Sequence, residues 1–167
     1  MVLPKAHRPV SRELDIRNEC RCFSFELTSV TRMFQVLDAE APRKAPEGTL
    51  SVAFVSLQKL RSLHQKYLSD DTPTDVMTFV GDEKMSFAGE IVVAPAFARR
   101  QLMIYQTTFS EEVILYLVHA YLHLCGFDDV EPGDRAQMRE AERDYLRLLK
   151  EHGAVPSFAW NSRWRRV

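Results

Sequence analysis

The most informative part of the sequence is His119-Ala-Tyr-Leu-His123-Leu-Cys-Gly126-Phe-Asp-Asp129, which has the pattern of a metal site. Two histidines four residues apart on a helix lie on the same face, so both imidazoles can bind one cation. A glycine just after the last apolar residues is a helix C-terminal signal, so Gly126 is expected to turn the chain back. The turn would bring Asp129 to the pair as a third ligand.

The composition of the whole chain fits one compact domain. It has 167 residues, 46% of them hydrophobic, and a formal net charge of -1. These values allow a sizeable core and exclude a uniformly basic nucleic-acid binder. Three cysteines do not make the framework of a secreted disulfide-rich protein.

No stretch approaches the roughly 18 apolar residues of a membrane span, so we expect a cytoplasmic protein without a membrane segment.

Hydrophobic periodicity predicts a mixed α/β fold with helices dominating the C-terminal half. The pattern at Thr108 and Glu111 is that of a capping box that begins the histidine helix. Residues 81–87 are expected to connect two strands as a hairpin. The predicted strands are 14–26, 49–55, 75–80 and 89–94, and the other predicted helices are 29–40, 56–68, 96–106 and 132–151.

The chain is expected to divide into a core and two extensions. Residues 1–13 mix prolines with basic residues and show no hydrophobic period, so they are interpreted as an N-terminal extension. Residues 14–153 form the single domain. Residues 154–167 are a basic and aromatic tail in which Trp160 and Trp164 alternate with arginines. That composition can stack bases and neutralise phosphates, but a docking or disordered extension is an equally good interpretation.

A histidine pair alone does not establish a metal site, because core histidines are often satisfied by ordinary hydrogen bonds. Gly126 and Asp129 make a metal site the better interpretation, because the spacing of positions 119, 123, 126 and 129 matches the layout of the metzincin peptidases. Ala120 stands where those peptidases have the glutamate that deprotonates water, which argues against a peptidase. The remaining candidates for a base are Asp75, Asp128 and the substrate phosphate. Asp128 is interpreted more readily as orienting a ligand.

Three motifs together resemble the YbeY family of bacterial endoribonucleases, also called rRNA maturation factors, over residues 49–153. The family has His-Gly-x-Leu-His-Leu-x-Gly-Tyr-Asp-His where this chain has residues 119–129. Its Asp-x-Pro-Thr-Asp-Val-Leu-Ser-Phe is similar to residues 71–79, Asp-Thr-Pro-Thr-Asp-Val-Met-Thr-Phe. Its Gly-Asp-Ile strand resembles Gly-Glu-Ile-Val-Val at residues 89–93.

The resemblance implies a small, mostly parallel four-stranded sheet with helices packed around it. It also implies one zinc ion held by His119, His123 and the residue at position 129. The activity implied is hydrolysis of single-stranded RNA, in maturation of the 16S rRNA 3′ end and in ribosome quality control. The partners expected are therefore single-stranded rRNA and proteins of the small ribosomal subunit, and the protein is expected to be a monomer.

The chain departs from the family pattern at three positions. Asp129 replaces a histidine, which adds negative charge, should make metal-bound water less acidic, and makes manganese or iron more plausible beside zinc. Ala120 replaces a glycine, which a helix tolerates. Leu68 stands where many relatives have an arginine suited to clamping a phosphate.

The first functional hypothesis is a metal-dependent endoribonuclease. His119, His123 and Asp129 would bind the cation and Asp75 would take part in catalysis. Thr74 and Asp128 would support these residues without binding the metal. Positive charge for the RNA backbone would come from Lys66, Arg99 and Arg100. One alternative is a ribosome-assembly factor with a structural metal and little nuclease activity, which Leu68 favours. A metallopeptidase is the other, and Ala120 opposes it.

Overall fold

The structure is a computed structural model that describes residues 12–162. Its elements alternate between strands and helices in the first half and are mostly helical in the second, as expected. In chain order they are β1 (Leu14–Asn18), β2 (Phe23–Phe25), α1 (Leu27–Glu40), β3 (Thr49–Phe54), α2 (Leu57–Leu68), β4 (Val76–Asp82), the 3-10 helix η1 (Glu83–Met85), β5 (Phe87–Val93), α3 (Pro95–Tyr105), α4 (Phe109–Leu124), α5 (Pro132–Glu151) and β6 (Phe158–Trp160).

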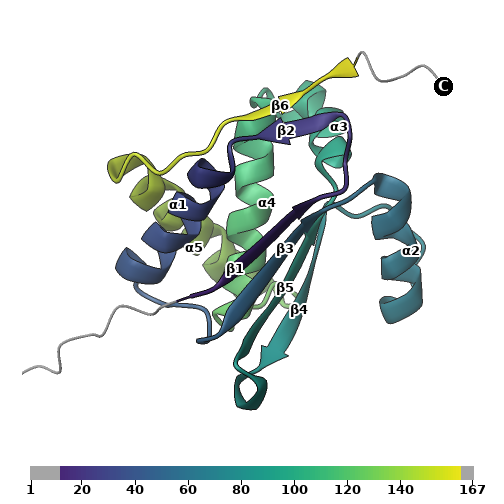
Figure 1. Cartoon of the computed structure of the whole chain (residues 1–167). Coiled ribbons are helices and arrows are strands. Elements are labelled where there is room, and N and C mark those ends of the chain that lie inside the picture. The colour runs from purple at the N-terminus through teal and green to yellow at the C-terminus, as the bar shows by residue number, and fades with distance from the viewer. Residues whose placement is uncertain (1–11, 163–167) are drawn as a thin grey trace, which may run out of the picture.

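The main sheet has four strands in the order β1-β3-β5-β4. The first three are parallel and β4 is an antiparallel edge strand, so the expected small, mostly parallel sheet is confirmed. Helices α1, α4 and α5 cover one face of the sheet and α2 lies on the other face (Figure 1). A parallel sheet needs such helical crossovers, and the helices bury the apolar side chains of both faces.

Helix α4 is the centre of the larger hydrophobic core. Its 16 residues are apolar on nearly all sides, as is typical of a helix enclosed by other elements. The core joins α4 to α1, α5 and one face of the sheet, through side chains such as Phe34, Val52, Leu117 and Tyr145. A second, smaller core lies between α2 and the opposite face of the sheet, around Leu60 and Met77.

Local sequence signals set the ends of the C-terminal helices. The predicted capping box is present: Glu111 N donates to Thr108 Oγ1 over 3.2 Å, and Thr108 N donates to a Glu111 carboxylate oxygen over 2.9 Å. Helix α5 has the predicted bounds, 132–151, with proline in its first turn. Such signals predict helix ends from sequence because a cap satisfies backbone groups that a helix end leaves unpaired.

The expected single strand over residues 14–26 is wrong, because the chain turns after β1. Asn18 Nδ2 donates to Phe23 O over 2.8 Å, and Cys20 N donates to Asn18 Oδ1 over 2.9 Å. The turn takes β2 out of the main sheet and pairs it with β6. The connection between β4 and β5 is also shorter than the expected residues 81–87, because β4 continues to Asp82 and β5 begins at Phe87.

Described residues from both expected extensions pack against the domain. Arg12, placed in the N-terminal extension, is almost fully buried in an ion pair with Asp38. At the other end, Phe158 is 5% exposed and forms part of β6, which lies beside β2 at the top of Figure 1. Residues 1–11 and 163–167, including Trp164, lie outside the described residues.

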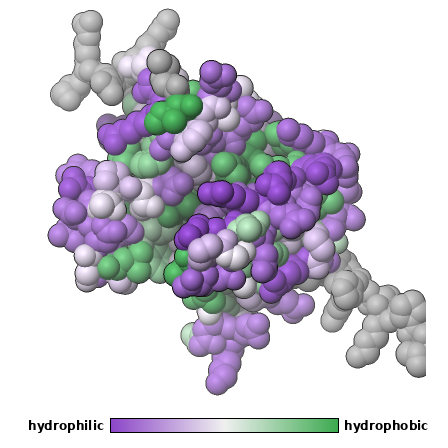
Figure 2. All heavy atoms as spheres, turned by 180° about the vertical axis from the view of Figure 1, so that it is seen from behind, coloured by the Kyte–Doolittle hydropathy of each residue, from purple (hydrophilic) through white to green (hydrophobic). Residues whose placement is uncertain are grey.

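Seen from the side opposite to Figure 1, the surface is mostly hydrophilic, with apolar side chains in smaller patches (Figure 2). Within residues 12–162, none of the helices has both the length and the apolar character needed to span a bilayer.

Candidate metal centre

The two predicted ligand histidines lie one above the other at the C-terminal end of α4. The Nε2 atoms of His119 and His123 are 3.0 Å apart, and the two rings are nearly perpendicular. Both side chains are about one quarter exposed, at 25% and 26%. The four-residue spacing therefore places both imidazoles on one face, as expected, because residues i and i+4 are neighbours along a helix.

Gly126 ends α4 with a tight turn. It has a φ of +86°, a conformation that a residue without a side chain adopts easily. Gly126 N donates to His123 O and Phe127 N donates to Leu122 O, both over 3.0 Å, which is the Schellman pattern of helix ends. The turn sends residues 127–129 back toward the histidine face.

Asp129 completes a group of three possible metal ligands. Its carboxylate oxygens lie 3.5 Å from His119 Nε2 and 3.8 Å from His123 Nε2. One ligand atom from each of the three residues lies within 4.8 Å of the other two. Asp128 is not one of these three residues, and its Oδ1 accepts from Asp129 N over 2.7 Å. It therefore orients the backbone that carries Asp129.

Each histidine is held by its other ring nitrogen. His119 Nδ1 is 2.7 Å from a carboxylate oxygen of Glu142 on α5. His123 Nδ1 is 3.1 Å from Phe127 O in the turn. A carbonyl or carboxylate oxygen can only accept, so in a neutral ring Nδ1 carries the proton and Nε2 has a free lone pair.

This donor set fits a divalent metal. Two free nitrogen lone pairs and a carboxylate converge on one point, an arrangement of electron-rich groups that a cation stabilises. Two imidazole nitrogens and one carboxylate oxygen are ligands of catalytic zinc sites, which leave further positions open. The contacts of Glu142 and Phe127 O with the outer nitrogens are those that orient histidine ligands in metal proteins.

The electrostatics of the site favour positive charge. Burial by itself opposes protonation of His119, but the hydrogen bond and charge of Glu142 outweigh it, with further contributions from Asp129 and Asp75. The pKa of His119 is therefore raised above its ordinary value of 6.5. The same negative groups that favour a proton on His119 also favour a metal cation beside it.

Asp75 and Thr74, predicted to take part in the site, lie directly before β4, the strand that packs against α4. Asp75 Oδ1 accepts from Val76 N over 2.8 Å and from Thr74 Oγ1 over 3.3 Å. Asp75 forms no ion pair with His119 among the described residues, yet its charge raises the His119 pKa. It is thus near the histidines without being one of the three clustered ligands.

The three predicted RNA-binding cations are not brought together at the metal centre. Lys66 Nζ lies 5.0 Å from the centre of the Tyr67 ring on α2. Arg99 on α3 stacks over Trp160, 5.2 Å from its ring centre, and Arg100 is exposed on the same helix. Trp160 packs against Phe109, at the end of α4 opposite to the histidines.

Cys125, which follows the histidine pair in the sequence, is buried, with an exposed fraction of 8%. Its thiol donates to Arg43 O over 3.5 Å. Burial raises the pKa of this thiol to about 12, so it is a poor source of the thiolate that binds metals. His64 is half-buried on α2, and its Nδ1 lies 3.2 Å from Thr72 O.

Sequence reasoning missed Glu142 as a partner of His119. One signal could have found it. Met138, Ala141, Tyr145 and Leu149 form the buried stripe of α5, and position 142 lies within that stripe at helical spacing. A carboxylate among apolar positions needs a hydrogen-bond or charge partner.

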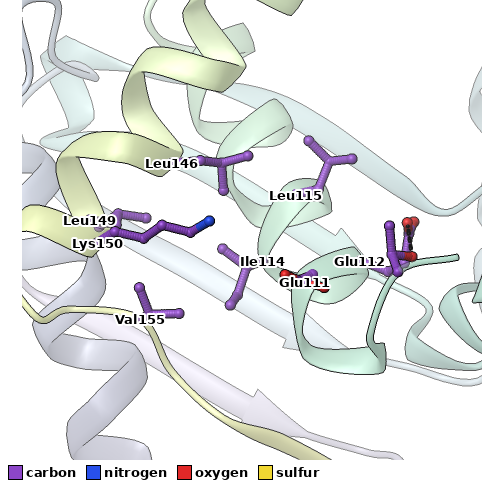
Figure 3. A pocket seen from close by; sticks show the side chains of 9 residues that line it. Glu111, Glu112, Ile114, Leu115, Leu146, Leu149, Lys150 and Val155 are labelled. Atoms are coloured by element: carbon purple, nitrogen blue, oxygen red, sulfur yellow. Dashed lines mark hydrogen bonds between the residues drawn. The ribbon is translucent and has the colours of Figure 1, made fainter. Parts of the chain in front are cut away.

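A cleft of about 190 Å³ lies at the other end of α4, between its first turns and the end of α5 (Figure 3). Its walls are mostly apolar, with Ile114, Leu146 and Val155 among them, and Glu111 and Lys150 lie at its edge. No residue of the candidate metal centre lines it, so this cleft is separate from the site described above.

Residues 15–150 match the family model described as Endoribonuclease YbeY. The chain belongs to the YbeY family. The Endoribonuclease YbeY of Protochlamydia amoebophila is 32% identical over 142 residues, which cover 83% of this chain and 93% of that protein. The one from Parabacteroides distasonis is 33% identical over 104 residues, or 62% of this chain and 73% of that protein.

A solved structure supports the fold. The solution structure of TM1509 from Thermotoga maritima matches with a TM-score of 0.57 and 24% identity, and the match covers 84% of this chain and 92% of that one. Membership of the YbeY family makes the protein a relative of nuclease hydrolases, and its His-His-Asp group supplies a possible metal site.

Proposed function

We propose that the protein is a metal-dependent endoribonuclease that cleaves single-stranded RNA. The observation that carries this proposal is the convergence of His119 Nε2, His123 Nε2 and the Asp129 carboxylate in a chain of the YbeY family. Glu142 and Phe127 O lie at the Nδ1 atoms of His119 and His123. They favour the tautomer with the proton on Nδ1, which leaves each Nε2 free to bind a metal.

A metal bound by these three residues would acidify a water molecule and neutralise charge on a phosphate. Two carboxylates outside the ligand group act on His119, and Glu142 is already bound to its Nδ1. Asp75 is therefore the candidate base that accepts a proton from water. Both hydrogen bonds that hold it go to Oδ1, so Oδ2 is the atom proposed to take the proton. Thr74 and Val76 N fix the direction in which Asp75 faces.

The natural substrate is proposed to be rRNA, with maturation of the 16S rRNA 3′ end and ribosome quality control as the processes served. Zinc is the proposed metal, and the carboxylate of Asp129 also suits manganese or iron. Proteins of the small ribosomal subunit are the proposed partners, in the cytoplasm, with the protein acting as a monomer. Lys66, Arg99 and Arg100 stay predicted RNA contacts.

RNA cleavage with controlled metal content tests the proposal. We expect the purified protein to cut a labelled single-stranded RNA but not the matching duplex, to stop after chelation, and to recover on addition of Zn²⁺ or Mn²⁺. Asp129→Ala should reduce cleavage by more than about tenfold. Asp144→Ala, at an exposed ion pair of α5, is the matched control and should cleave like the native protein. Equal cleavage by Asp129→Ala and the native protein would contradict the proposal.

The second candidate is a ribosome-assembly factor whose metal is structural. Leu68, where many relatives have the arginine suited to clamping a phosphate, favours it, and this side chain is 62% exposed at the end of α2. Metal-loaded protein that binds rRNA without cutting it would support this candidate over the nuclease.

A further inference from the structure

An arginine near the start of α5 lies against the segment that carries the third metal ligand. Arg135 Nη1 donates to Val130 O and, over 3.4 Å, to Asp129 O. The Arg135 side chain is exposed to solvent. A guanidinium group is therefore fixed at the surface against the backbone of a residue whose carboxylate belongs to the candidate metal centre.

These two hydrogen bonds leave most of the donors of Arg135 unused. A guanidinium keeps its charge and has N–H groups on all three of its nitrogens. Both bonds to the backbone use Nη1, so Nε and Nη2 have no hydrogen bond within residues 12–162. No carboxylate of this range forms an ion pair with Arg135. Other arginines do have carboxylate partners, namely Arg12, Arg17, Arg61 and Arg147.

The candidate metal centre has little net attraction for a phosphate. Asp129 adds a carboxylate where the family has a neutral histidine, and Glu142 is bound to His119. A divalent metal only balances these two carboxylates, so the centre as a whole stays close to neutral. The position of the family's phosphate clamp is Leu68, which carries no charge. A further cation beside the metal would therefore favour the approach of an RNA phosphate.

Arg135 is better placed to supply that charge than the other cations considered. Lys66 and Arg99 pack against aromatic rings outside the turn that carries the ligands. Arg43 lies near this turn, but its guanidinium stacks on the Phe127 ring, 4.5 Å from the ring centre. Of these four residues, Arg135 is the one with a hydrogen bond to a predicted metal ligand.

We propose that Arg135 binds a phosphate group of the substrate RNA next to the metal centre. The N–H groups of Nε and Nη2 lie along one edge of the planar guanidinium, so they can donate side by side to the oxygens of one phosphate. Arg135 thereby supplies the contact for which position 68 has no cation. The inference rests on the proposed function, since it adds a contact with the same substrate.

The salt dependence of RNA binding tests this contact. Fluorescence anisotropy measures the affinity of the protein, with Zn²⁺ added, for a short labelled single-stranded RNA that is kept on ice and checked to be intact. We expect Arg135→Ala to bind about tenfold more weakly at low salt. The slope of log affinity against log salt should fall by about 0.7, the change for one phosphate contact on a single strand.

Arg147→Ala is the matched control, because it removes the same charge from an exposed ion pair of the same helix. Its slope should equal that of the native protein. Arg135→Lys retains the charge and should restore most of the slope lost in Arg135→Ala. Equal slopes for Arg135→Ala and the native protein would overturn the inference.

Metal content separates the phosphate contact from a purely structural role. A residue that only held Asp129 in place would lose the metal when replaced, whereas Arg135→Ala is expected to keep the native metal content per chain. Weaker RNA binding that merely follows a loss of metal in Arg135→Ala would overturn the inference.

Cleavage assays keep the two proposals apart. RNA binding that depends on Arg135 in this way, without cleavage by the native protein, would contradict the proposed nuclease and support the contact. Cleavage by the native protein with an unchanged slope in Arg135→Ala would support the nuclease and overturn the contact.

Discussion

At the scale of single residues, the two histidines of the candidate centre differ in what holds them. His123 is held by a neutral carbonyl, and His119 by the carboxylate of Glu142. A carboxylate partner stabilises a positive charge on the ring and makes the imidazole a more basic ligand. His119 is therefore the histidine at which protons and metal should compete most strongly.

Metal affinity should accordingly depend on pH. The pKa of His119 in the folded, metal-free protein lies above 6.5, so the stability contributed by protonated His119 is fully present below pH 6.5 and is lost as pH rises through the folded pKa. Metal binding requires the neutral ring. Affinity for Zn²⁺, measured by calorimetry, should rise by up to about tenfold per pH unit until pH exceeds the folded pKa, and then level off.

Glu142→Gln provides the control for this pH dependence. The amide cannot supply the negative charge that raises the pKa of His119, so the levelling should occur at a lower pH. The affinity above that pH should fall by about 10-fold to 100-fold, the usual effect of losing a partner of a histidine ligand. Identical pH profiles for the two proteins would show that Glu142 does not act on His119.

The three metal ligands could be predicted from sequence because they depend on local geometry. The helical period aligns His119 with His123, and Gly126 returns the chain to bring Asp129 near them. Glu142 comes from another helix, and its approach depends on how α5 packs on α4.

At the scale of elements, a buried polar network ties α4 to α1. The Arg12 guanidinium pairs with Asp38 on α1, and Tyr121 OH donates to Asp38 Oδ1 over 2.8 Å. Ala45 N donates in turn to the Tyr121 hydroxyl over 3.3 Å. Tyr121 lies between the two ligand histidines in sequence, so this network helps to set the position of the part of α4 that carries them.

Asp38→Asn should strongly destabilise the protein. The side chains of Arg12 and Asp38 are only 3% and 7% exposed, and removing one partner of a buried pair leaves an uncompensated charge. The expected loss in free energy of unfolding is about 3–5 kcal/mol, measured by urea denaturation. Asp144→Asn breaks an exposed pair with Arg147 and should cost less than about 1 kcal/mol. Similar losses in the two variants would show that the Arg12 pair is not buried in solution.

Element prediction was most successful where caps and periodicity agreed. The bounds of α5 and the capping box of α4 followed from residues within a few positions of each other. The turn after β1 was missed because residues 14–26 keep an alternating pattern through it, and the Asn18 hydrogen bonds that make the turn have no periodic signal. The pairing of β2 with β6 joins the two ends of the domain, which no local pattern indicates.

At the scale of the whole molecule, the sheet and α4 place the candidate centre beside the edge strand β4, while Arg99 and Trp160 lie toward the opposite end of α4. His123 lies 14 positions after Phe109 in α4, which is about 20 Å along the helix at about 1.5 Å per residue. An RNA strand that contacts both regions would have to follow the length of α4. The sequence shows that Arg99 and Trp160 are present, but only the tertiary fold shows how far they lie from the histidines.

The metal centre can be tested by measuring metal content per chain, by mass spectrometry, on the native protein and on His123→Ala purified side by side. We expect about one zinc or similar divalent ion per native chain and almost none in the variant, because loss of one of three ligands should abolish tight binding. Native protein without metal after metal-supplemented purification, or equal metal in both proteins, would contradict the assignment of His119, His123 and Asp129 as a metal centre.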